Sequence, residues 1–486
     1  MNTVRIPINS ATHIVAVFLS GERSAQSKAP RICLPRTKYE AVILSERSES
    51  KDPDEARHST TVRPFLPMNS PFSSSNRIRR SAALLAILLA SASAFAQTAP
   101  LTMQQAVDLA RSKSPTLLAA EQNLLSVKAQ ELQAATRQNP YFAATGSNLT
   151  EPDSNGNPYA IGVGVGRLFE RGEKRRWRID SARSTTVETD DQLQLTVQQT
   201  VLAVRTAFTN LVIAKAAKKL ADDNLADFKK EVAIGNDRYK AGDLAKLDYE
   251  RLDLQLAQFE SDDSNAITAM QQTSLQLQVL LGIDKPSADF DVIGDVVPPP
   301  VALSMDDLEQ KALAARPDLK AAVAAVAVAD AEVKLTYANG TSDPTLEADY
   351  NRNGIDNSVG FNLNIPIRIF DRNQGNKATA RFTAQASRFT VTALHNQVVS
   401  DVDQAYSGYI NSKLLSDRYN GHYLAESKDV LDIARFSYEH GNLALIDYLD
   451  ALRDSRSVAT DALNSYQQTW IAIHQLSFVT AADIAP

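Results

Sequence analysis

Apolar residues recur at intervals of three and four along residues 173–281, a stretch without proline. Its first part, residues 173–234, also lacks glycine, and at about 1.5 Å per residue it would form a helix of roughly 90 Å. Such spacing gives a helix one narrow apolar stripe, so we expect it to pack against other long helices. The residues at the start of the stripe are Leu193, Val197, Val201, Val204, Phe208 and Leu211.

A turn containing Gly242 ends this helix, and the same spacing restarts just beyond it, which predicts a long antiparallel helical hairpin. Residues 239–249 align without gaps with residues 438–448, so the hairpin occurs twice. The second copy predicts helices over residues 377–439 and 443–480. The match extends to two earlier pairs of segments, residues 101–103 with 303–305 and residues 169–171 with 370–372. An internal repeat of about half the chain must therefore organise the fold.

Between the opening of each half and its hairpin, the period of the apolar residues changes to two, which predicts β-strands. One face of each strand is apolar and the other is polar or glycine, as in barrels that meet lipid outside and water inside. Glycine alternates within the first strand instead of following it, which argues against a dinucleotide-binding loop. The residues predicted to face lipid are Ile161, Val163 and Val165 in the first half and Val359, Phe361, Leu363, Ile365 and Ile367 in the second.

The composition is that of a packed protein, with 44% hydrophobic residues. A mean hydropathy of −0.24 excludes a membrane protein built from many spanning helices, and a formal net charge of −6 gives no reason to expect nucleic acid as a partner. The single cysteine, Cys33, excludes an intrachain disulfide.

Residues 68–96 read as a signal peptide, because a basic segment precedes a short apolar run and the small residues Ala94 and Ala96 predict cleavage before Gln97. Residues 1–67 lack pattern, and we interpret them as an N-terminal extension that is disordered or not native to the protein. The remaining divisions are a first repeat over residues 97–283, a proline-rich linker over residues 284–303 and a second repeat over residues 304–486.

No motif of a known catalytic site occurs in the expected mature chain, which lacks cysteine, His-Glu-x-x-His, Gly-x-Ser-x-Gly and a phosphate loop. Its histidines are scattered, and we interpret each as a surface or packing residue of the helices and not as a metal ligand. They are His395, His422, His440 and His474. We therefore expect no enzyme activity, no cofactor and no resident metal.

Four strands cannot close a barrel, and an open sheet edge in hydrocarbon leaves unpaired amides that cost several kcal/mol each. Several chains must therefore share one barrel. Three copies would supply twelve strands, within the even-numbered range of such barrels, and their hairpins would form a helical tube beneath it. The expected fold class is a mixed α/β membrane protein that conducts through a shared pore.

With these paired turns and the duplicated order of strands and helices, the chain resembles the outer membrane efflux proteins of the TolC type. The resemblance covers nearly all of residues 101–482, and residues 168–175 and 365–376 are similar to the heavy-metal branch that exports cobalt, zinc and cadmium. It implies a homotrimer in the outer membrane of a Gram-negative bacterium, with the helices in the periplasm. The implied partners are a periplasmic adaptor (membrane fusion) protein and an inner-membrane pump of the RND type.

The resemblance also assigns a gate near the second turn. Asp447 and Asp450, which share one helix face, match an acidic pair that narrows the tunnel, although acids at a helix start also favour the helix dipole. Like charges gathered there would attract cations. Tyr438 and Asp248 match contacts that close the tunnel by a hydrogen bond between the two hairpins.

One member of the closing set is absent, because Leu443 stands where the family has a basic residue, and Lys246 is the alternative. The two hairpin turns match the surface on which the adaptor docks, although their glycines also suit a plain turn. The docking residues implied are Gly242, Asp243, Leu244, Gly441, Asn442 and Leu443.

Two other functions fit parts of the pattern. A periplasmic coiled-coil adaptor or scaffold would explain the helical hairpins, but it would leave the strands without a role. An outer membrane channel for type I protein secretion would use the same architecture with a different cargo. The sequence does not identify the exported substrate.

Overall fold

The structure is a computed structural model that describes residues 100–147, 159–288, 290–301 and 304–484. By its contacts the chain divides into two units, Met1–Leu84 and Leu85–Pro486, and every described residue belongs to the second unit. The predicted N-terminal extension and signal peptide lie outside the described residues.

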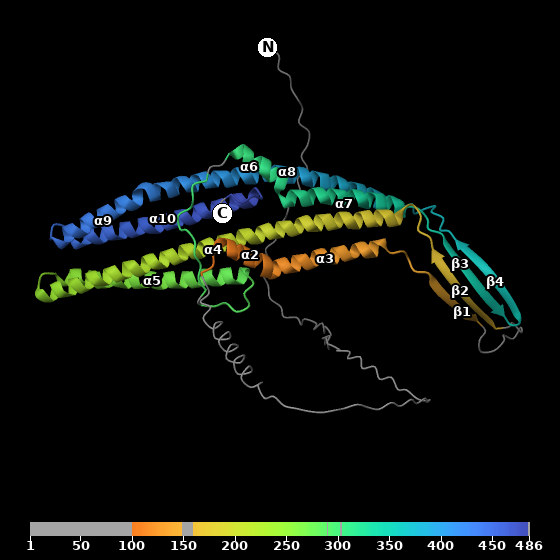
Figure 1. The fold of residues 1–486 in the computed structure, drawn as a ribbon, viewed down its shortest axis with the longest axis horizontal. Helices are drawn as coiled ribbons and strands as arrows, with labels where there is room; N and C mark the ends of the chain where they lie inside the picture. The colour runs from red at the N-terminus through yellow and green to blue at the C-terminus, as the bar shows by residue number, and fades with distance from the viewer. Residues whose placement is uncertain (1–99, 148–158, 289, 302–303, 485–486) are drawn as a thin grey trace, which may run out of the picture. The chain divides into compact units, whose positions relative to one another are not determined.

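Helices and strands alternate in the same order in both halves of the described chain (Figure 1). In the first half they are α2 (Met103–Lys113), α3 (Pro115–Ala135), β1 (Tyr141–Ser147), β2 (Ala160–Leu168), α4 (Lys174–Ala241) and α5 (Lys246–Leu280). In the second half they are α6 (Met305–Ala315), α7 (Pro317–Asn339), β3 (Thr345–Asn353), β4 (Asp356–Asn364), α8 (Gln374–Arg418), the π-helix η1 (Tyr419–Tyr423), α9 (Leu424–Glu439) and α10 (Leu445–Val479).

The first hairpin consists of α4, an uninterrupted helix of 68 residues, and the antiparallel α5. Phe228 of α4 stacks on Phe259 of α5 with ring centroids 4.4 Å apart. Among the described helices, α4 alone is long and apolar enough to cross a membrane by composition, but 44% of that apolar window is buried in the structure. Its length therefore serves packing along the hairpin, as the narrow apolar stripe predicts.

The second hairpin differs from the first at one place. Its outgoing helix, predicted over residues 377–439, begins at Gln374 and is interrupted by the π-helix η1, which contains Gly421. A π-turn inserts one residue into the helical ladder, and glycine there lowers the resistance of the backbone to that insertion. The spacing of the apolar residues gives no sign of this interruption.

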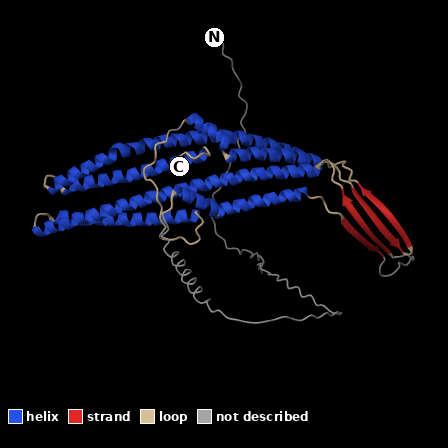
Figure 2. Ribbon diagram, in the orientation of Figure 1, coloured by secondary structure: helices blue, strands red, loops and turns tan. Residues whose placement is uncertain are grey.

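The order of neighbouring strands in the sheet matches the order of neighbouring helices in the helical layer. The four strands form one antiparallel sheet in the order β1-β2-β3-β4. On the helical side, α3 contacts α4, α4 contacts α7 and α7 contacts α8 (Figures 1 and 2). Because α3 leads into β1 and β4 leads into α8, the edges of the helical layer continue the edges of the sheet.

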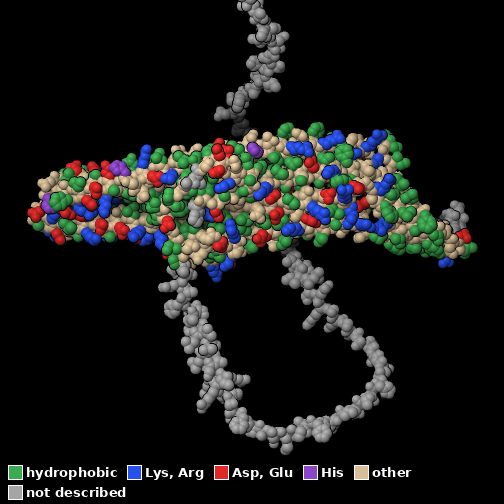
Figure 3. Space-filling view, turned by 45° about the horizontal axis from the view of Figure 1, so that its top comes forward, with side chains coloured by type: hydrophobic (Ala, Val, Ile, Leu, Met, Phe, Trp, Pro, Cys, Tyr) green, Lys and Arg blue, Asp and Glu red, His purple; other side chains and the backbone are tan. Residues whose placement is uncertain are grey.

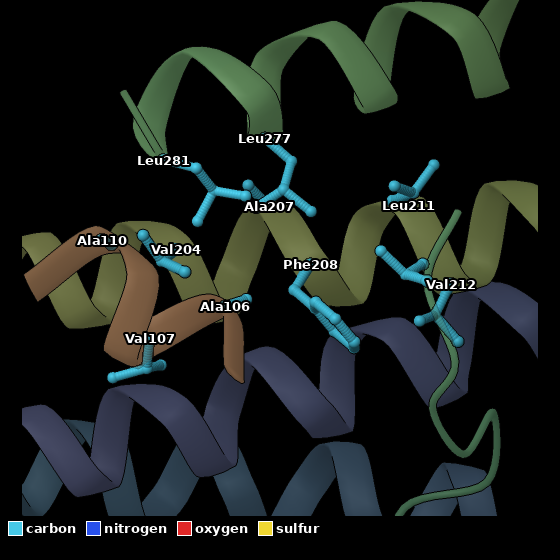
Figure 4. Packing of buried hydrophobic residues seen from close by; sticks show 11 residues of the cluster. Ala106, Val107, Ala110, Val204, Ala207, Phe208, Leu211, Val212, Leu277 and Leu281 are labelled. Carbon is cyan, nitrogen blue, oxygen red and sulfur yellow. The ribbon is translucent and has the colours of Figure 1, made fainter. Parts of the chain in front are cut away.

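Two clusters of buried hydrophobic residues stabilise the middle of the helical layer. In the first, Val107 of α2 and Leu277 of α5 pack with Val204 and Phe208 of α4 (Figure 4). A corresponding cluster in the second half joins α6, α8 and α10, with Val402 and Ile473 fully buried. The short helices α2 and α6 therefore cover the apolar stripe of the long helix of each hairpin, α4 and α8 respectively.

Candidate functional site

Both hairpin tips are built alike. Gly242 and Gly441 end their helices with φ angles of 85° and 74°, a left-handed conformation that favours glycine. The backbone N–H of Asp243 donates to Arg238 O at 2.9 Å, and that of Asn442 donates to Ser437 O at 2.8 Å. A Cβ added at either glycine would meet nothing within 4 Å, so the glycines serve the backbone conformation and not close packing.

The six predicted docking residues divide into two groups at these tips. Gly242, Asp243, Gly441 and Asn442 are exposed, whereas Leu244 and Leu443 are half-buried and pack against the cluster between the hairpins. Of these six residues, the four that are open to a partner are therefore polar or glycine, and the two leucines stabilise the tips from within.

A stacked tyrosine pair closes each tip. Tyr239 stacks on Tyr249 and Tyr438 stacks on Tyr448, with ring centroids 5.2 Å apart in both pairs. The two pairs occupy equivalent positions of the repeat, but Tyr448 is fully buried, because the cluster that joins the hairpins surrounds it.

Tyr438 and Asp248, the predicted closing pair, lie near each other. Burial raises the pKa of Tyr438, and the carboxylate of Asp248 adds to this rise, while Arg238, 5.7 Å from the centre of the Tyr438 ring, opposes it. Among the hydrogen bonds of the described residues, none joins Tyr438 to Asp248, which instead accepts from Arg251 Nη1 at 3.4 Å.

Arginines supply the basic contacts between the hairpins. Lys246, the alternative considered above, pairs with Glu250 of its own helix at 3.2 Å. Arg435 of α9 instead reaches Glu231 of α4, with its Nε 3.7 Å from the carboxylate, and burial raises the pKa of Glu231.

Farther from the tips, Arg456 of α10 forms an ion pair with Asp262 of α5 and lies 4.0 Å from the centre of the Phe259 ring. Sequence reasoning missed these arginines, because each partner lies in the other half of the chain and helical periodicity does not identify it.

The acidic pair of the predicted gate lies at the start of α10, directly past the second tip. Asp447 is exposed and Asp450 is half-exposed, and Asp450 forms an ion pair with Arg453, whose Nη2 lies 3.0 Å from the carboxylate. Both carboxylates are accessible to ions, and Arg453 partly offsets the charge of one of them.

The sheet has one apolar and one polar face, as the alternation predicts. Paired residues on neighbouring strands share a face, so Val163 lies beside Tyr350, which in turn lies beside Val359. Figure 3 shows hydrophobic side chains gathered over the strand end of the face in view. The predicted lipid-facing residues within strands are all exposed on this apolar face: Ile161, Val163, Val165, Val359, Phe361 and Leu363.

Ile365 and Ile367 are also exposed, but they lie beyond β4. The predicted strand is wrong here. Its partner β3 begins at Thr345, which pairs with Asn364, and the preceding residue, Pro344, has no backbone N–H to donate to a longer strand. These two isoleucines belong to the segment that leads into α8.

The opposite face of the sheet carries carboxylates and amides. Tyr141 of β1 donates to Glu347 Oε2 at 3.1 Å, and Asn351 donates to Asp349. A side chain at each of three alternate glycines of β2 would collide with a neighbouring strand's side chain: Gly162 with Asn351, Gly164 with Glu347 and Gly166 with Tyr141. Because these glycines have no side chains, the polar side chains of the neighbouring strands can lie across β2.

In the described part of the chain, no group of three or more His, Cys, Asp or Glu side chains is arranged to hold a metal ion. Of the histidines, His474 is buried, and its Nε2 shares a hydrogen bond of 2.9 Å with Thr209 Oγ1 of α4. Arg205, also buried, extends past it to Asp483 at 2.6 Å. This group joins the two halves of the chain and offers no open coordination site.

Within the described residues, the sheet has one apolar face and two unpaired edges, and it is continuous with helices longer than any single core requires. These features define a channel-forming outer membrane protein. The family model of the outer membrane efflux proteins matches residues 106–283 and 308–481, and the chain belongs to that family. It is the outer membrane channel component of a tripartite efflux system, with its helical part in the periplasm. Members of the family are channel proteins and not enzymes.

Known relatives agree with this assignment. The cobalt-zinc-cadmium resistance protein CzcC of Cupriavidus metallidurans is 25% identical over 359 residues, which cover 73% of this chain and 84% of CzcC. Solved structures with the same fold include CusC (TM-score 0.67, 18% identity, 78% of this chain and 92% of that one). VceC of Vibrio cholerae has a TM-score of 0.65 and 16% identity over 79% of this chain and 97% of its own.

Proposed function

We propose that three copies of this chain form one outlet duct that receives heavy-metal cations from a periplasmic adaptor and an inner-membrane pump of the RND type. The observation that carries the proposal is the four-stranded sheet with its apolar outer face and two free edges, which needs further copies to close. Family channels form trimers and work with adaptors and pumps. The cation cargo is supported by the relative CzcC, named for resistance to cobalt, zinc and cadmium.

The acidic pair beyond the second tip is proposed as the narrowest point of the duct. In a trimer, Asp447 and Asp450 would form two rings of three carboxylates, which attract cations and repel anions. The exposure of Asp447 and the half-exposure of Asp450 support this role. Arg453 lies beside Asp450 and moderates the charge of the ring that Asp450 would form.

Replacing both Asp447 and Asp450 with asparagine is expected to lower the ratio of cation to anion permeability and to relieve block by divalent ions. Planar-bilayer recordings measure both quantities. The matched control is Asp461→Asn, an exposed carboxylate on the same face of α10 and about 21 Å farther along the helix. Selectivity and block that remain as in the unchanged protein would exclude the pair as the gate.

The polar tips are proposed as the adaptor's docking surface. Asp243→Trp adds bulk at an exposed turn position without straining a glycine, so trimers should still form while export fails. Cells carrying the variant should accumulate cobalt, zinc and cadmium as cells without the channel do, measured as metal content. Asp253→Trp, exposed on α5 away from the tip, is the control and should export normally. Full export by Asp243→Trp would contradict docking at this tip.

A further inference from the structure

Positive charge gathers where the helical layer meets the sheet. Figure 3 shows lysine and arginine side chains over this end of the layer, on the same face of the molecule as the hydrophobic side chains over the strands. Lys377 is the fourth residue of α8, and Lys334 lies five residues before the end of α7. Since a helix rises about 1.5 Å per residue, both cations lie within roughly 10 Å of the helix ends that join the strands.

Two aromatic rings hold three cations at this end of the layer. Lys377 Nζ and Arg381 Cζ, both of α8, lie 5.2 Å and 5.1 Å from the centre of the Tyr337 ring of α7. Lys334 Nζ of α7 lies 4.9 Å from the centre of the Trp177 ring of α4. A ring attracts a cation without neutralising it, so all three positive charges persist. These five side chains, which span α4, α7 and α8, form what we call the junction patch.

The three cations of the junction patch have no acidic partner among the described residues. By contrast, Arg388, seven residues beyond Arg381 on α8, pairs with Asp330 at 2.7 Å. Lys334 and Arg381 are exposed and Lys377 is half-buried, so the charges are open to an outside group. The carbonyl end of α7 favours one nearby cation through the helix dipole, but it does not account for three unpaired cations around two rings.

The neighbouring sheet identifies the partner as a membrane lipid. The apolar face of the sheet meets hydrocarbon, and exposed apolar side chains continue beyond β4 into the segment that leads to α8. In this segment Ile367 and Phe370 are 83% and 89% exposed. Where the hydrocarbon of a membrane ends, lipid phosphates begin, and tyrosine, tryptophan and basic side chains are enriched at that level. The junction patch has this composition and directly follows the apolar surface.

We propose that the junction patch binds the phosphate of an anionic phospholipid, such as phosphatidylglycerol, in the periplasmic leaflet of the outer membrane. Lys377 and Arg381 donate to the phosphate oxygens, and the acyl chains lie along the apolar segment before α8. Phosphatidylcholine binds less well, because its choline carries a positive charge into a patch that is already positive. This contact sets the depth at which the helices leave the membrane, and it is independent of the cargo and of the gate.

Native mass spectrometry of the detergent-purified channel tests the junction patch, because it counts bound lipid molecules. Dioleoylphosphatidylglycerol should bind more tightly than dioleoylphosphatidylcholine, which has the same acyl chains. Lys377→Gln combined with Arg381→Gln should weaken phosphatidylglycerol binding by about tenfold or more, since each cation beside an anionic lipid contributes roughly fivefold. Binding of phosphatidylcholine should not change. Each single variant should weaken phosphatidylglycerol binding by about threefold or more, which provides the measurement if the double variant does not assemble.

Two further double variants separate a specific patch from a general effect of charge. Arg418→Gln with Lys428→Gln removes the same two charges from exposed side chains of the second hairpin, far along it from the sheet, and should bind phosphatidylglycerol normally. Lys377→Arg with Arg381→Lys keeps both charges and should also bind it normally.

Three results would overturn the proposal. The first is equal binding of the two lipids by the unchanged protein, and the second is an equal loss of phosphatidylglycerol binding when either pair of cations is changed to glutamine. The third is displacement of phosphatidylglycerol by inorganic phosphate at an equal concentration, which would make the ligand a free anion and not a lipid.

Discussion

Phe361→Arg is expected to prevent assembly of the channel in the membrane. Phe361 lies next to the centre of β4, on the apolar face, and is 78% exposed. A positive charge on the lipid face near the bilayer midplane costs about 2 to 4 kcal/mol, and each copy in the ring would add that penalty. Loss of the heat-sensitive trimer band from outer membrane fractions would report the effect.

Two control substitutions test the expected position of Phe361 in the bilayer and its place on the apolar face of the sheet. Leu363→Arg lies on the same face near the end of β4, where the penalty falls to about 0 to 1 kcal/mol, so trimers should persist at reduced yield. Asn362→Arg lies on the opposite face, which would point to the lumen, and should assemble normally. Equal trimer yields for Phe361→Arg and Asn362→Arg would show that the two faces are assigned the wrong way round.

Acidification should weaken the contact between the halves of the chain through His474. Burial lowers the pKa of His474 from 6.5 to about 4, and the charge of Arg205 contributes in the same direction. Between those two pH values the unfolded chain binds a proton that the folded chain excludes, so stability falls as the pH falls. The full loss is about 3 kcal/mol, since each pKa unit corresponds to about 1.36 kcal/mol.

The comparison that isolates this effect uses His474→Gln, which removes the titrating ring. The unfolding free energy of the unchanged protein, measured in urea, should drop between pH 6.5 and pH 4 by about 3 kcal/mol more than that of the variant. His422→Gln, at an exposed histidine paired with Glu426, should behave as the unchanged protein does. Equal drops in the unchanged protein and in His474→Gln would mean that His474 does not control acid stability.

Local periodicity was sufficient to predict the helical hairpins, the two tips and the faces of the strands, because each depends on residues close together in sequence. Local periodicity did not predict features that depend on a contact with a distant segment of the chain. The alternation of apolar residues continues to Ile367, but β4 ends at Asn364, where the pairing strand begins. The π-helix around Gly421 likewise left no signal in the apolar spacing.

Contacts between the hairpins were the least predictable part of the candidate site. The resemblance directed attention to Lys246, yet that side chain pairs within its own helix, and Arg435 and Arg456 make the contacts across the hairpins. An arginine on a helix face pairs with any acid within reach, so the choice depends on the register between two helices far apart in sequence. That register is a property of the packed structure.

The pairing of β2 with β3 has a consequence for folding. These strands pair across the two halves, with Ala160 opposite Asn353 and Leu168 opposite Thr345, so the central pair of the sheet closes over well more than a hundred residues of chain. Contacts of such long range form slowly. The first hairpin of strands must therefore wait, with its free edge and its apolar valines uncovered, until the chain as far as β3, at residue 353, has been exported. During that interval the chain is open to aggregation, and a binding factor that shields the β2 edge would determine how much of it matures.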